Sequence, residues 1–573
     1  MRLFAIALLA AALSLEAGAG QSTSHAARLR GANRESSQPL HSPLPMIHHY
    51  GAAGQENRAG GSATDTEGIR WADHFPGNDL GAQINAADSN LGKEAGEIWV
   101  GRQGTVATKV TISSNHSLRL VVPTTWKAGM VVQNNNTISA NGCAALITVA
   151  FTPPGPLILG KGTSSLKLQN LCAEAAPKSV GYGLVEAWGR GVEVTGCILT
   201  NVRLGDFNSS MDVKLIGNTA ISDRNDPPSG QGVNFTFTQN AVASGNIIRG
   251  FEHGLQWWGG DPNPDKGQGG VANARGARNL TYTGNTVTDV GGGGIWGGMG
   301  EGIVVSGNVV ERCGDVCLDS EGSNSVVFSN NYVMDGTNGA IATFYYNRDV
   351  LVTGNTVVSS SAAKPLLRTY TNWQKAPYDR DEQVVGNHFT CLDTSPCFIN
   401  STTGLPERFV FKDNTLRNVT VDVSDTNPKH ILVISGNDFL FDAVASKVPG
   451  AIRAARTYSL APGTPGSCDI SNNTVRSDVP QPPGSAAIMV YQDDPQIAPL
   501  TTIQGNRLLG LHPFPVDIAV GGGSSNPAVA PVFVVRDNLM GAGVFSRLDQ
   551  ARPRSTVKLE GNYRMDSSPL PGQ

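Results

Sequence analysis

The stretches "VVSGNVV" (304–310), "VFSNNYV" (327–333) and "LVTGNTV" (351–357) decide the fold, because one pattern returns at an almost constant distance. In each stretch an asparagine follows a strand-like run and a Gly or Asn. Successive asparagines are 331 − 308 = 23 and 355 − 331 = 24 residues apart. The same pattern recurs in both directions, at Asn218, Asn246, Asn285, Asn387, Asn414, Asn437, Asn473, Asn506, Asn538 and Asn562. A short fixed period of this kind predicts a solenoid.

Each repeat is interpreted as three short β runs separated by turns. Gly or Asn at a turn tolerates the left-handed backbone conformation that a sharp corner needs. One coil cannot bury its own apolar face, so the coils must stack, which gives parallel strands around one long core. We therefore predict an all-β fold, a parallel β-helix over residues 101–573, in which the Gly-Asn repeats are structural.

The composition agrees with a chain rich in strands and turns. The 573 residues include 68 glycines and 33 prolines, with 6% aromatic and 16% charged residues, which is not typical of a helical globular protein. Lysine and arginine number 43 against 47 aspartate and glutamate residues, and no basic stripe stands out. We therefore expect no nucleic-acid partner.

Residues 1–19 are interpreted as a secretory signal peptide. They contain Arg2, an apolar run from Leu3 to Leu15 and a small-residue exit, and the run is too short for a membrane-spanning helix. We expect an exported protein, extracellular or periplasmic, without a membrane span. Residues 20–70 lack apolar periodicity and are expected to form a flexible leader.

Residues 71–100 are predicted to form an N-terminal cap segment with an amphipathic helix. Asn78 or Asp79 is the candidate N-cap and Gly92 ends the helix. The apolar residues at helical spacing share one face, and they are Leu80, Ile84, Ala87 and Leu91. A first strand is expected at residues 96–100.

Eight cysteines are present, an even number that permits disulfides in an oxidising compartment. Cys313 with Cys317, and Cys391 with Cys397, are close enough in sequence to bridge across turns. A zinc site at the first pair would need a second Cys or His pair at suitable spacing, which the sequence does not offer.

The repeats, together with the segment "DLGAQINAAD" (79–88), resemble the pectate-lyase-like superfamily of right-handed parallel β-helix proteins. The resemblance runs from about residue 71 to residue 566. It implies a right-handed solenoid whose open N-terminal end is capped by that helix. Many enzymes and some adhesins share this fold, so the resemblance does not identify the reaction.

Counting from each repeat asparagine places residues of different coils in columns. Ten positions after Asn246, Asn285, Asn308 and Asn331 lies a mostly apolar column expected to face the core, namely Gln256, Ile295, Leu318 and Ile341. Because strand side chains alternate, the eleventh and thirteenth positions are expected outside, on one face, where they place Trp257, Trp296, Asp319 and Glu321. Trp258 is then expected to point toward the core.

The stretch "CGDVCLDSEGSN" (313–324) gathers three carboxylates in a weakly charged chain. Two outward carboxylates at i and i+2 have backbones roughly 6 to 7 Å apart, which is compatible with both retaining and inverting glycosidases. The strand also resembles, locally, the Asp-Asp-Cys active strand of polygalacturonases. Asp315 and Cys317 match that motif, but Val316 replaces its second aspartate, so galacturonan specificity is not implied.

A row of aromatic residues beside acids is typical of polysaccharide-binding surfaces. The candidate catalytic residues are Asp315, Asp319 and Glu321. The candidate substrate-binding residues are Trp257, Trp296, His253, Tyr345, Arg368 and Tyr370, walled by loops around residues 259–276 and 360–382. The structural alternative is a solvated acidic face with a surface histidine.

Three functions are compatible with this pattern. The preferred one is a secreted glycoside hydrolase, in which two of the three acids act as general acid and as base or nucleophile, with no cofactor or metal. The second is a polysaccharide lyase whose carboxylates hold Ca2+ and whose base is Arg368 or Lys364. The third is a non-catalytic glycan-binding protein.

Overall fold

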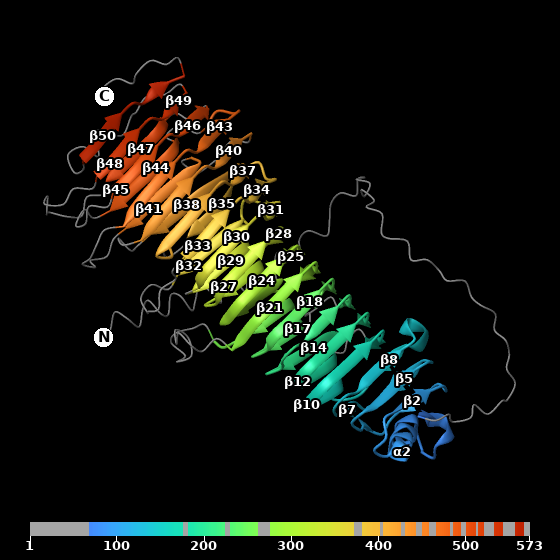
Figure 1. Cartoon of the computed structure of the whole chain (residues 1–573). Coiled ribbons are helices and arrows are strands. Elements are labelled where there is room, and N and C mark those ends of the chain that lie inside the picture. Colours follow the sequence, from blue (N-terminus) through green and yellow to red (C-terminus); the bar gives the residue numbers. More distant parts are fainter. Residues whose placement is uncertain are drawn as a thin grey trace, which may run out of the picture. The chain divides into compact units, whose positions relative to one another are not determined.

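The chain winds into coils of three strands, and each strand pairs in parallel with the equivalent strand one coil further along (Figure 1). Strands β24 (Gly300–Ser306), β25 (Val309–Cys313) and β26 (Val316–Glu321) form one coil. They pair in parallel with β27 (Asn324–Ser329), β28 (Tyr332–Gly336) and β29 (Gly339–Tyr345) of the next coil. Repetition of this pattern gives three parallel faces, which confirms the predicted β-helix.

The structure is a computed structural model, and it describes the following residues: 68–175, 181–223, 230–261, 276–345, 347–371, 381–401, 405–425, 430–442, 450–457, 466–481, 485–493, 500–510, 514–520, 532–541 and 556–565. The predicted signal peptide and almost all of the predicted leader lie outside the described residues. The described residues all fall in one unit, Ala63–Gln573.

The first face runs from the start of the described chain to its end. Its strands besides β24 and β27 are β1 (Ile69–Trp71), β2 (Gly96–Val100), β5 (His116–Leu120), β8 (Thr137–Ala140), β15 (Lys214–Ile216), β18 (Gln239–Ser244), β21 (Ala277–Thr283), β30 (Arg348–Thr353), β33 (Asp381–Val385), β36 (Arg408–Lys412), β39 (Ile431–Ser435), β42 (Ser467–Ser471), β45 (Leu500–Gln504), β48 (Val532–Arg536) and β50 (Thr556–Glu560). Two long strands bend from the third face into the first, β10 (Pro156–Gln169) and β12 (Gly183–Thr195).

The second face follows the asparagine turn in each coil. Its strands besides β25 and β28 are β3 (Gly104–Val106), β6 (Thr124–Trp126), β9 (Ile147–Val149), β11 (Cys172–Ala175), β13 (Ile198–Thr200), β16 (Thr219–Ile221), β19 (Ile247–Arg249), β22 (Thr286–Val290), β31 (Thr356–Ser359), β34 (His388–Cys391), β37 (Thr415–Arg417), β40 (Asp438–Phe441), β43 (Thr474–Ser477), β46 (Arg507–Gly510), β49 (Leu539–Met540) and β51 (Tyr563–Arg564).

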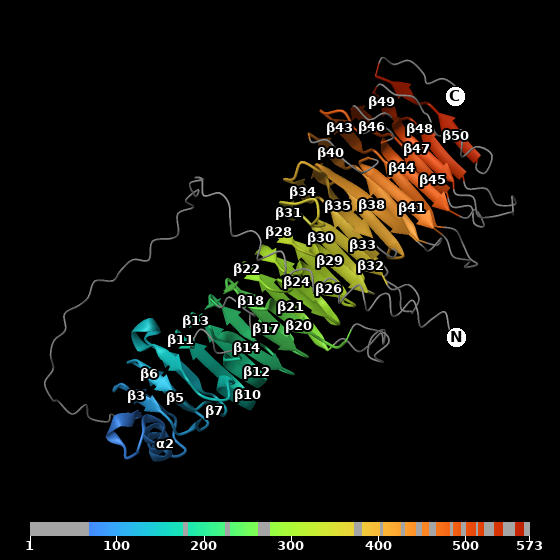
Figure 2. The same ribbon diagram turned by 180° about the vertical axis from the view of Figure 1, so that it is seen from behind.

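The third face carries the acidic strand β26 and is visible in Figure 2. Its other strands besides β29 are β4 (Val110–Ile112), β7 (Met130–Val132), β14 (Arg203–Asn208), β17 (Gln231–Thr236), β20 (His253–Trp258), β23 (Ile295–Gly298), β32 (Leu367–Thr371), β35 (Cys397–Ser401), β38 (Val419–Asp425), β41 (Ile452–Thr457), β44 (Ala486–Asp493) and β47 (Phe514–Val520).

The core is the continuous apolar interior of the stacked coils. Ile295, Leu318 and Ile341 are in register on β23, β26 and β29 and each is 0% exposed. The predicted core column is therefore confirmed for these three residues. The prediction was wrong for Gln256, because Leu255 pairs with Ile295 and Gln256 pairs with Trp296 on the outward side. Large rings such as Phe235 and Phe328 fill the same interior, where apolar side chains from three faces meet.

The repeat asparagines form a buried ladder along the solenoid. Asn308 donates from Nδ2 to Oδ1 of Asn331 at 3.0 Å and to the carbonyl of Tyr282 at 3.0 Å. Its own Oδ1 accepts from the backbone N and the Nδ2 of Asn285, both at 2.9 Å. The same amide-to-amide bond joins every consecutive pair from Asn218 to Asn562.

The left-handed residue at this turn is the one before the ladder asparagine. Gly307 has φ 66° and Asn330 has φ 54°, a region that Gly and Asn adopt more readily than other residues. The sequence pattern identified the turn correctly. It did not reveal that the following asparagine is buried to bond its neighbours in the adjacent coils.

The predicted N-terminal helix is present as α2 (Leu80–Leu91), which follows a short 3-10 turn, η1 (Ala72–His74). Asp79 is the N-cap and accepts from the backbone N of Gly81 at 2.7 Å. Gly92 is the C-cap with φ 67°. The predicted apolar face is buried and packs against the first strands at the end of the stack (Figure 2). A second 3-10 turn, η2, spans Gly142–Ala145.

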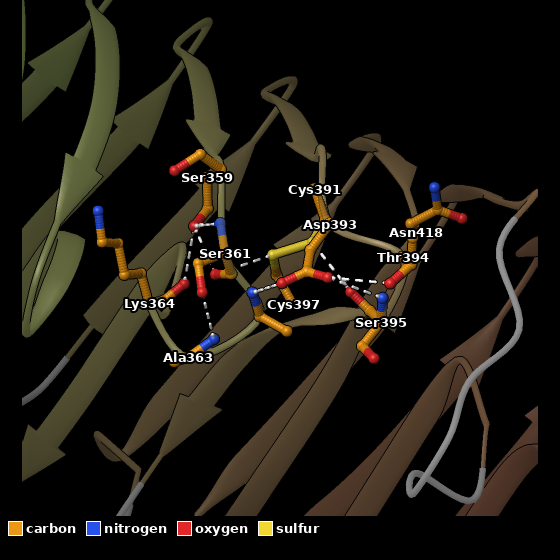
Figure 3. Close-up of a disulfide and its surroundings, with 12 residues drawn as sticks. Ser359, Ser361, Ala363, Lys364, Cys391, Asp393, Thr394, Ser395, Cys397 and Asn418 are labelled. Carbon is orange, nitrogen blue, oxygen red and sulfur yellow. Dashed lines mark hydrogen bonds between the residues drawn. A yellow bond between two sulfur atoms is a disulfide. The ribbon is translucent and has the colours of Figure 1, made fainter. Parts of the chain in front are cut away.

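Two disulfides are formed. Cys391–Cys397 closes a short turn as predicted, and Figure 3 shows Asp393 inside that turn accepting from the backbone N of Ala362 at 2.9 Å. Cys143–Cys172 is a second bridge that the sequence did not single out. The suggested bridge between Cys313 and Cys317 is not formed. Both thiols are free and buried in this structure. Within the described ranges, no helix is long and apolar enough to cross a membrane.

Candidate functional site

Strand β26 places the two central acids on the outward side of the third face. Leu318 belongs to the core, and Ser320 also points inward, where its Oγ donates to Oδ1 of Asn347 at 2.8 Å. Asp319 and Glu321 alternate with them and therefore point away from the core. In the neighbouring coil, Asp319 pairs with Trp296 and Glu321 with Gly298.

Asp319 is on the predicted side but is not exposed. Only 4% of the residue is accessible, and its Oδ1 has no hydrogen-bond partner among the described residues. Burial raises the pKa of Asp319 well above its usual range, and the charges of Glu321 and Asp315 raise it further. The expectation of an exposed carboxylate was wrong, since a column count gives the side of a strand but not the cover from neighbouring side chains.

Glu321 is half-buried and its pKa is raised to about 7. Burial is the main cause, and the negative charges of Asp315 and Asp261 add to it. Both carboxyls on this strand therefore hold their protons more tightly than an ordinary exposed acid. Asp261, which follows β20, was not among the predicted site residues, and nothing in its sequence surroundings distinguishes it from an ordinary loop aspartate.

Asp315 is exposed in the turn between β25 and β26, and its charge acts on the other residues of the site. Its negative charge raises the pKa values of Asp319 and Glu321, and it also acts on His253 and Arg368. These five residues come from three strands and one turn of three coils. The structure thus brings together the three predicted acids and two of the predicted binding residues.

His253 and two tryptophans form an aromatic group beside the acids. The rings of His253 and Trp296 are 4.8 Å apart, and the ring of Trp258 lies 6.3 Å from Trp296 at an edge-on angle. Nδ1 of His253 accepts from the backbone N of Gly293 at 2.9 Å. Burial lowers the pKa of His253, against the charges of Glu252 and Asp315 that raise it. His253 is therefore a neutral acceptor at this nitrogen.

Trp257, predicted to be the exposed ring, is 0% exposed and packs 5.8 Å from Tyr282 in the core. The prediction was wrong, and its neighbour Trp258 is the half-buried ring on the outside. The reason is that the turn from the second face to the third face is one residue shorter in this coil than in the next. Arg249 pairs with Thr288 and Leu255 with Ile295, so the first coil uses 255 − 249 = 6 residues where the next uses 295 − 288 = 7.

Arg368 lies on β32, two coils beyond Asp319, and pairs in register with Ala342. Its Nη1 donates to the backbone O and the Oδ1 of Asn338, and its guanidinium lies 5.9 Å from the ring centre of Phe344. Burial lowers the pKa of Arg368, against the charge of Asp315. Asn338 and Phe344 were missed, because a turn residue and a strand residue of common type carry no signal of their own.

The remaining predicted residues are less informative. Tyr345 is half-buried at the end of β29, with φ 69°. Tyr370 pairs with Phe344 in register, and its side chain lies outside the described residues. Residues 262–275 of one inserted loop and residues 372–380 of the other, which were expected to wall the site, also lie outside them.

Lys364, the other candidate lyase base, is placed elsewhere. Its Nζ lies 3.5 Å from Asp335. Both residues line a pocket of about 430 Å³ that also contains Asp289 and Arg312 and whose lining does not include the acidic pair. Lys364 is therefore not part of the site on the third face.

No group of three or more His, Cys, Asp or Glu side chains is placed to hold a metal ion in the part of the chain that the structure describes.

Residues 263–373 match the family model described as a right handed beta helix region. The matched range includes the acidic strand β26 and Arg368. The chain is thus a right-handed parallel β-helix, as the resemblance implied. No curated protein sequence matches the chain significantly.

Several solved structures are similar to this chain. The A-module of the mannuronan C-5 epimerase of Azotobacter vinelandii is 11% identical, with 69% of this chain and 98% of that chain covered and a TM-score of 0.36. A mutant tailspike protein of E. coli bacteriophage HK620 in complex with a pentasaccharide is 12% identical, with coverage of 78% and 76% and a TM-score of 0.40. A DFA-IIIase from Arthrobacter chlorophenolicus is 12% identical, with coverage of 74% and 94% and a TM-score of 0.34.

Proposed function

We propose that this chain is an exported glycoside hydrolase that cleaves a polysaccharide with Asp319 as general acid and Glu321 as base or nucleophile. The observation that carries the proposal is a pair of carboxyls at i and i+2 on the outward side of one strand, both with raised pKa values. The pKa of Glu321 is about 7 and that of Asp319 is raised well above its usual range. A raised pKa favours the protonated form of a carboxyl, and glycosidic cleavage needs one protonated and one ionised carboxyl.

In this mechanism Asp319 protonates the oxygen of the leaving sugar. Glu321, once ionised, either activates a water molecule or attacks the anomeric carbon directly. The negative charge of Asp315 is close enough to both acids to raise their pKa values. The same charge would stabilise the positive charge that develops on the sugar ring in the transition state.

The aromatic group supports a sugar substrate. Trp258 and Trp296 present two half-buried rings beside the acids, and such rings stack on the apolar faces of sugars. Arg368 supplies hydrogen-bond donors on the opposite side of Asp319. The predicted signal peptide and the two disulfides support export to an oxidising compartment.

A polysaccharide lyase is the second candidate, and one observation favours it. Arg368 is half-buried with a lowered pKa, and a base with a lowered pKa suits removal of a proton next to a uronate carboxylate. In that reaction the nearby carboxylates would hold Ca2+. Asp319→Asn would then reduce activity through the loss of a metal ligand.

A glycan panel scored together for new reducing ends and for unsaturated products tests the proposal. Reducing ends without unsaturation, unchanged by a chelator, are expected. Unsaturated products that vanish with the chelator and return with Ca2+ would support the lyase. A polymer that binds without giving any product would leave only a glycan-binding protein.

A further inference from the structure

One outward column of the third face holds polar side chains over seven consecutive coils, with a single interruption. The strands are β17, β20, β23, β26, β29, β32 and β35, and the paired residues in this column are Asn234, Gln256, Trp296, Asp319, Ala342, Arg368 and Asn400. Outward positions of a strand need no particular residue type. We therefore infer that a column of amides, an indole, a carboxyl and a guanidinium forms a surface with a binding role.

Each polar member of this column has a buried atom without a hydrogen-bond partner among the described residues. The atoms are Oδ1 of Asn234, Oε1 of Gln256, Nε1 of Trp296, Oδ1 of Asp319, Nε of Arg368 and Oδ1 of Asn400. Gln256 and Asp319 are 7% and 4% exposed. Native proteins rarely leave buried polar groups unpaired, because each one is destabilising. Six such atoms in one column indicate that a bound ligand supplies their missing hydrogen-bond partners.

The side chains can reach such a ligand. A terminal amide presents an oxygen and a nitrogen, and rotation about its last bond exchanges their positions. The unpaired oxygens of Asn234 and Asn400 can thus turn outward when a hydroxyl group arrives. The rotation needs no movement of the strand.

An ion pair lies one coil beyond the column at each end. One coil before Asn234 lies Asp206, which pairs with Arg203 at 2.8 Å. One coil after Asn400 lies Asp422, which pairs with Arg453 at 2.9 Å. The stretch with unpaired atoms therefore has a defined length of six coil steps, or about 29 Å at the usual strand spacing.

We propose that this column is the binding site of one unbranched polysaccharide segment that lies parallel to the axis of the solenoid, and that the chain acts on internal linkages. The inference rests on the proposed function for the reaction at Asp319. Asp319 is the fourth of the seven positions, with three coils on either side. About six sugar residues span this length, so the reacting linkage lies in the middle of the bound segment.

The two arms of the column differ in chemistry. Asn234, Gln256 and Trp296 offer neutral hydrogen-bonding groups on one side of Asp319. On the other side Arg368 offers a cation whose Nε is unpaired among the described residues, and a guanidinium suits a carboxylate or other anionic substituent.

The test uses the full chain, its variants Asn234→Ala and Asn400→Ala, and Asp422→Ala as the matched control one coil beyond the column. Each polymer of the glycan panel that gives product is digested, and the sizes of the earliest products are measured. Long products are expected from the first time point. Both asparagine variants should lower kcat/KM on the polymer about tenfold and leave a three-residue oligosaccharide unaffected, while the control changes neither.

Release of single sugars or pairs from the first time point would overturn the inference, as would equal effects of Asp422→Ala and Asn234→Ala. Retardation of the same proteins in gels that contain each polymer separates this inference from the proposed function. If a polymer retards the wild-type chain without being cleaved, the hydrolase proposal fails. The column is still supported in that case if the polymer retards both asparagine variants, and not the control, more weakly than the wild-type chain. Retardation by no polymer overturns the column as well.

Discussion

Asp319 is an acid that faces outward yet is shut off from water, and this combination sets its chemistry. The alternation of Leu318 and Asp319 could be predicted from the repeat count, because register follows directly from residue number in a solenoid. The burial of Asp319 could not, because it depends on side chains from other coils such as Trp296 and Arg368.

The first prediction concerns the pH profile of hydrolysis. Activity should rise as the pH increases through about 7, where Glu321 loses its proton, and fall only when Asp319 ionises. Asp319→Asn should lower kcat by about 100-fold or more. Glu321→Gln should do the same and remove the rise near neutral pH. Initial rates on a cleaved polymer across the pH range check both.

The melting temperature is the control measurement for Asp319→Asn and Glu321→Gln. Both acids have pKa values raised by folding, so their ionisation weakens the folded state as pH increases. Amide replacement should therefore not lower the melting temperature above neutral pH. If both variants keep full turnover, the reaction does not use Asp319 or Glu321, and Asp315 and His253 are the next candidates.

The second prediction separates the adjacent tryptophans. Trp257→Ala should lower the free energy of unfolding by about 3 to 5 kcal/mol, because a buried ring is removed from the core. Trp296→Ala should raise KM or weaken polymer binding more than it lowers kcat. Urea unfolding and steady-state kinetics distinguish the two effects. A loss of stability as large for Trp296 as for Trp257 would contradict its placement on the outside.

At the scale of elements, the asparagine ladder stabilises one corner of every coil between Asn218 and Asn562. A ladder residue inside the series donates to its successor and to a backbone carbonyl and accepts from its predecessor, as Asn308 does. The sequence revealed the turn through its Gly-Asn pattern, since the turn is local. It did not reveal the ladder, because that bonding joins residues of different coils.

The third prediction follows from the ladder. Asn308→Ala should leave partners in both neighbouring coils without hydrogen bonds, and each unsatisfied buried group costs about 1 to 3 kcal/mol. We expect a loss of several such increments in the free energy of unfolding, measured by urea denaturation. Asn90→Ala on the exposed side of α2 is the control, and similar losses in both variants would contradict the special role of the ladder.

The fourth prediction concerns Glu382, a carboxyl that joins two faces through the core. Glu382 lies on β33, is 3% exposed and accepts from the hydroxyls of Thr343 and Thr369. Burial raises its pKa from 4.5 to about 7, against the two threonine hydrogen bonds. The folded state thus binds a proton more tightly than the unfolded state, so stability falls as pH increases from 4.5 to about 7.

Glu382→Gln should remove the part of this fall that comes from Glu382 and leave the part that comes from Asp319 and Glu321. The difference is on the order of 3 kcal/mol above neutral pH, in favour of the variant. Thermal unfolding near about pH 5 and about pH 8 measures it. A wild-type melting temperature that does not change between these conditions would show that Glu382 is not the titrating group.

At the scale of the whole molecule, the solenoid has two ends whose strands need protection. At the N-terminal end α2 supplies it, with Leu80 and Ile84 buried against the first coil. The overall architecture was predictable because each coil contacts only its neighbours, so local repetition determines the whole. The site was only partly predictable, since it combines residues from four coils of unequal length.

The fifth prediction tests the cap. Ile84→Asp places a charge in a position that is 0% exposed and should displace α2, with a loss of about 3 kcal/mol or more. The uncovered strand edges should then favour association, seen as larger species in light scattering. Asn90→Asp, on the solvent side of the same helix, should remain the size of the wild-type chain.

The ladder also bears on how such a chain can change over evolutionary time. Consecutive ladder asparagines are separated by as few as 308 − 285 = 23 residues and by as many as 285 − 246 = 39, yet their amides meet at 2.9 Å in both cases. Insertions at the other turns of a coil therefore leave the asparagine ladder intact. New loops can be acquired above the third face without redesign of the frame, so lineages with different loops can come to accept different glycans on the same scaffold.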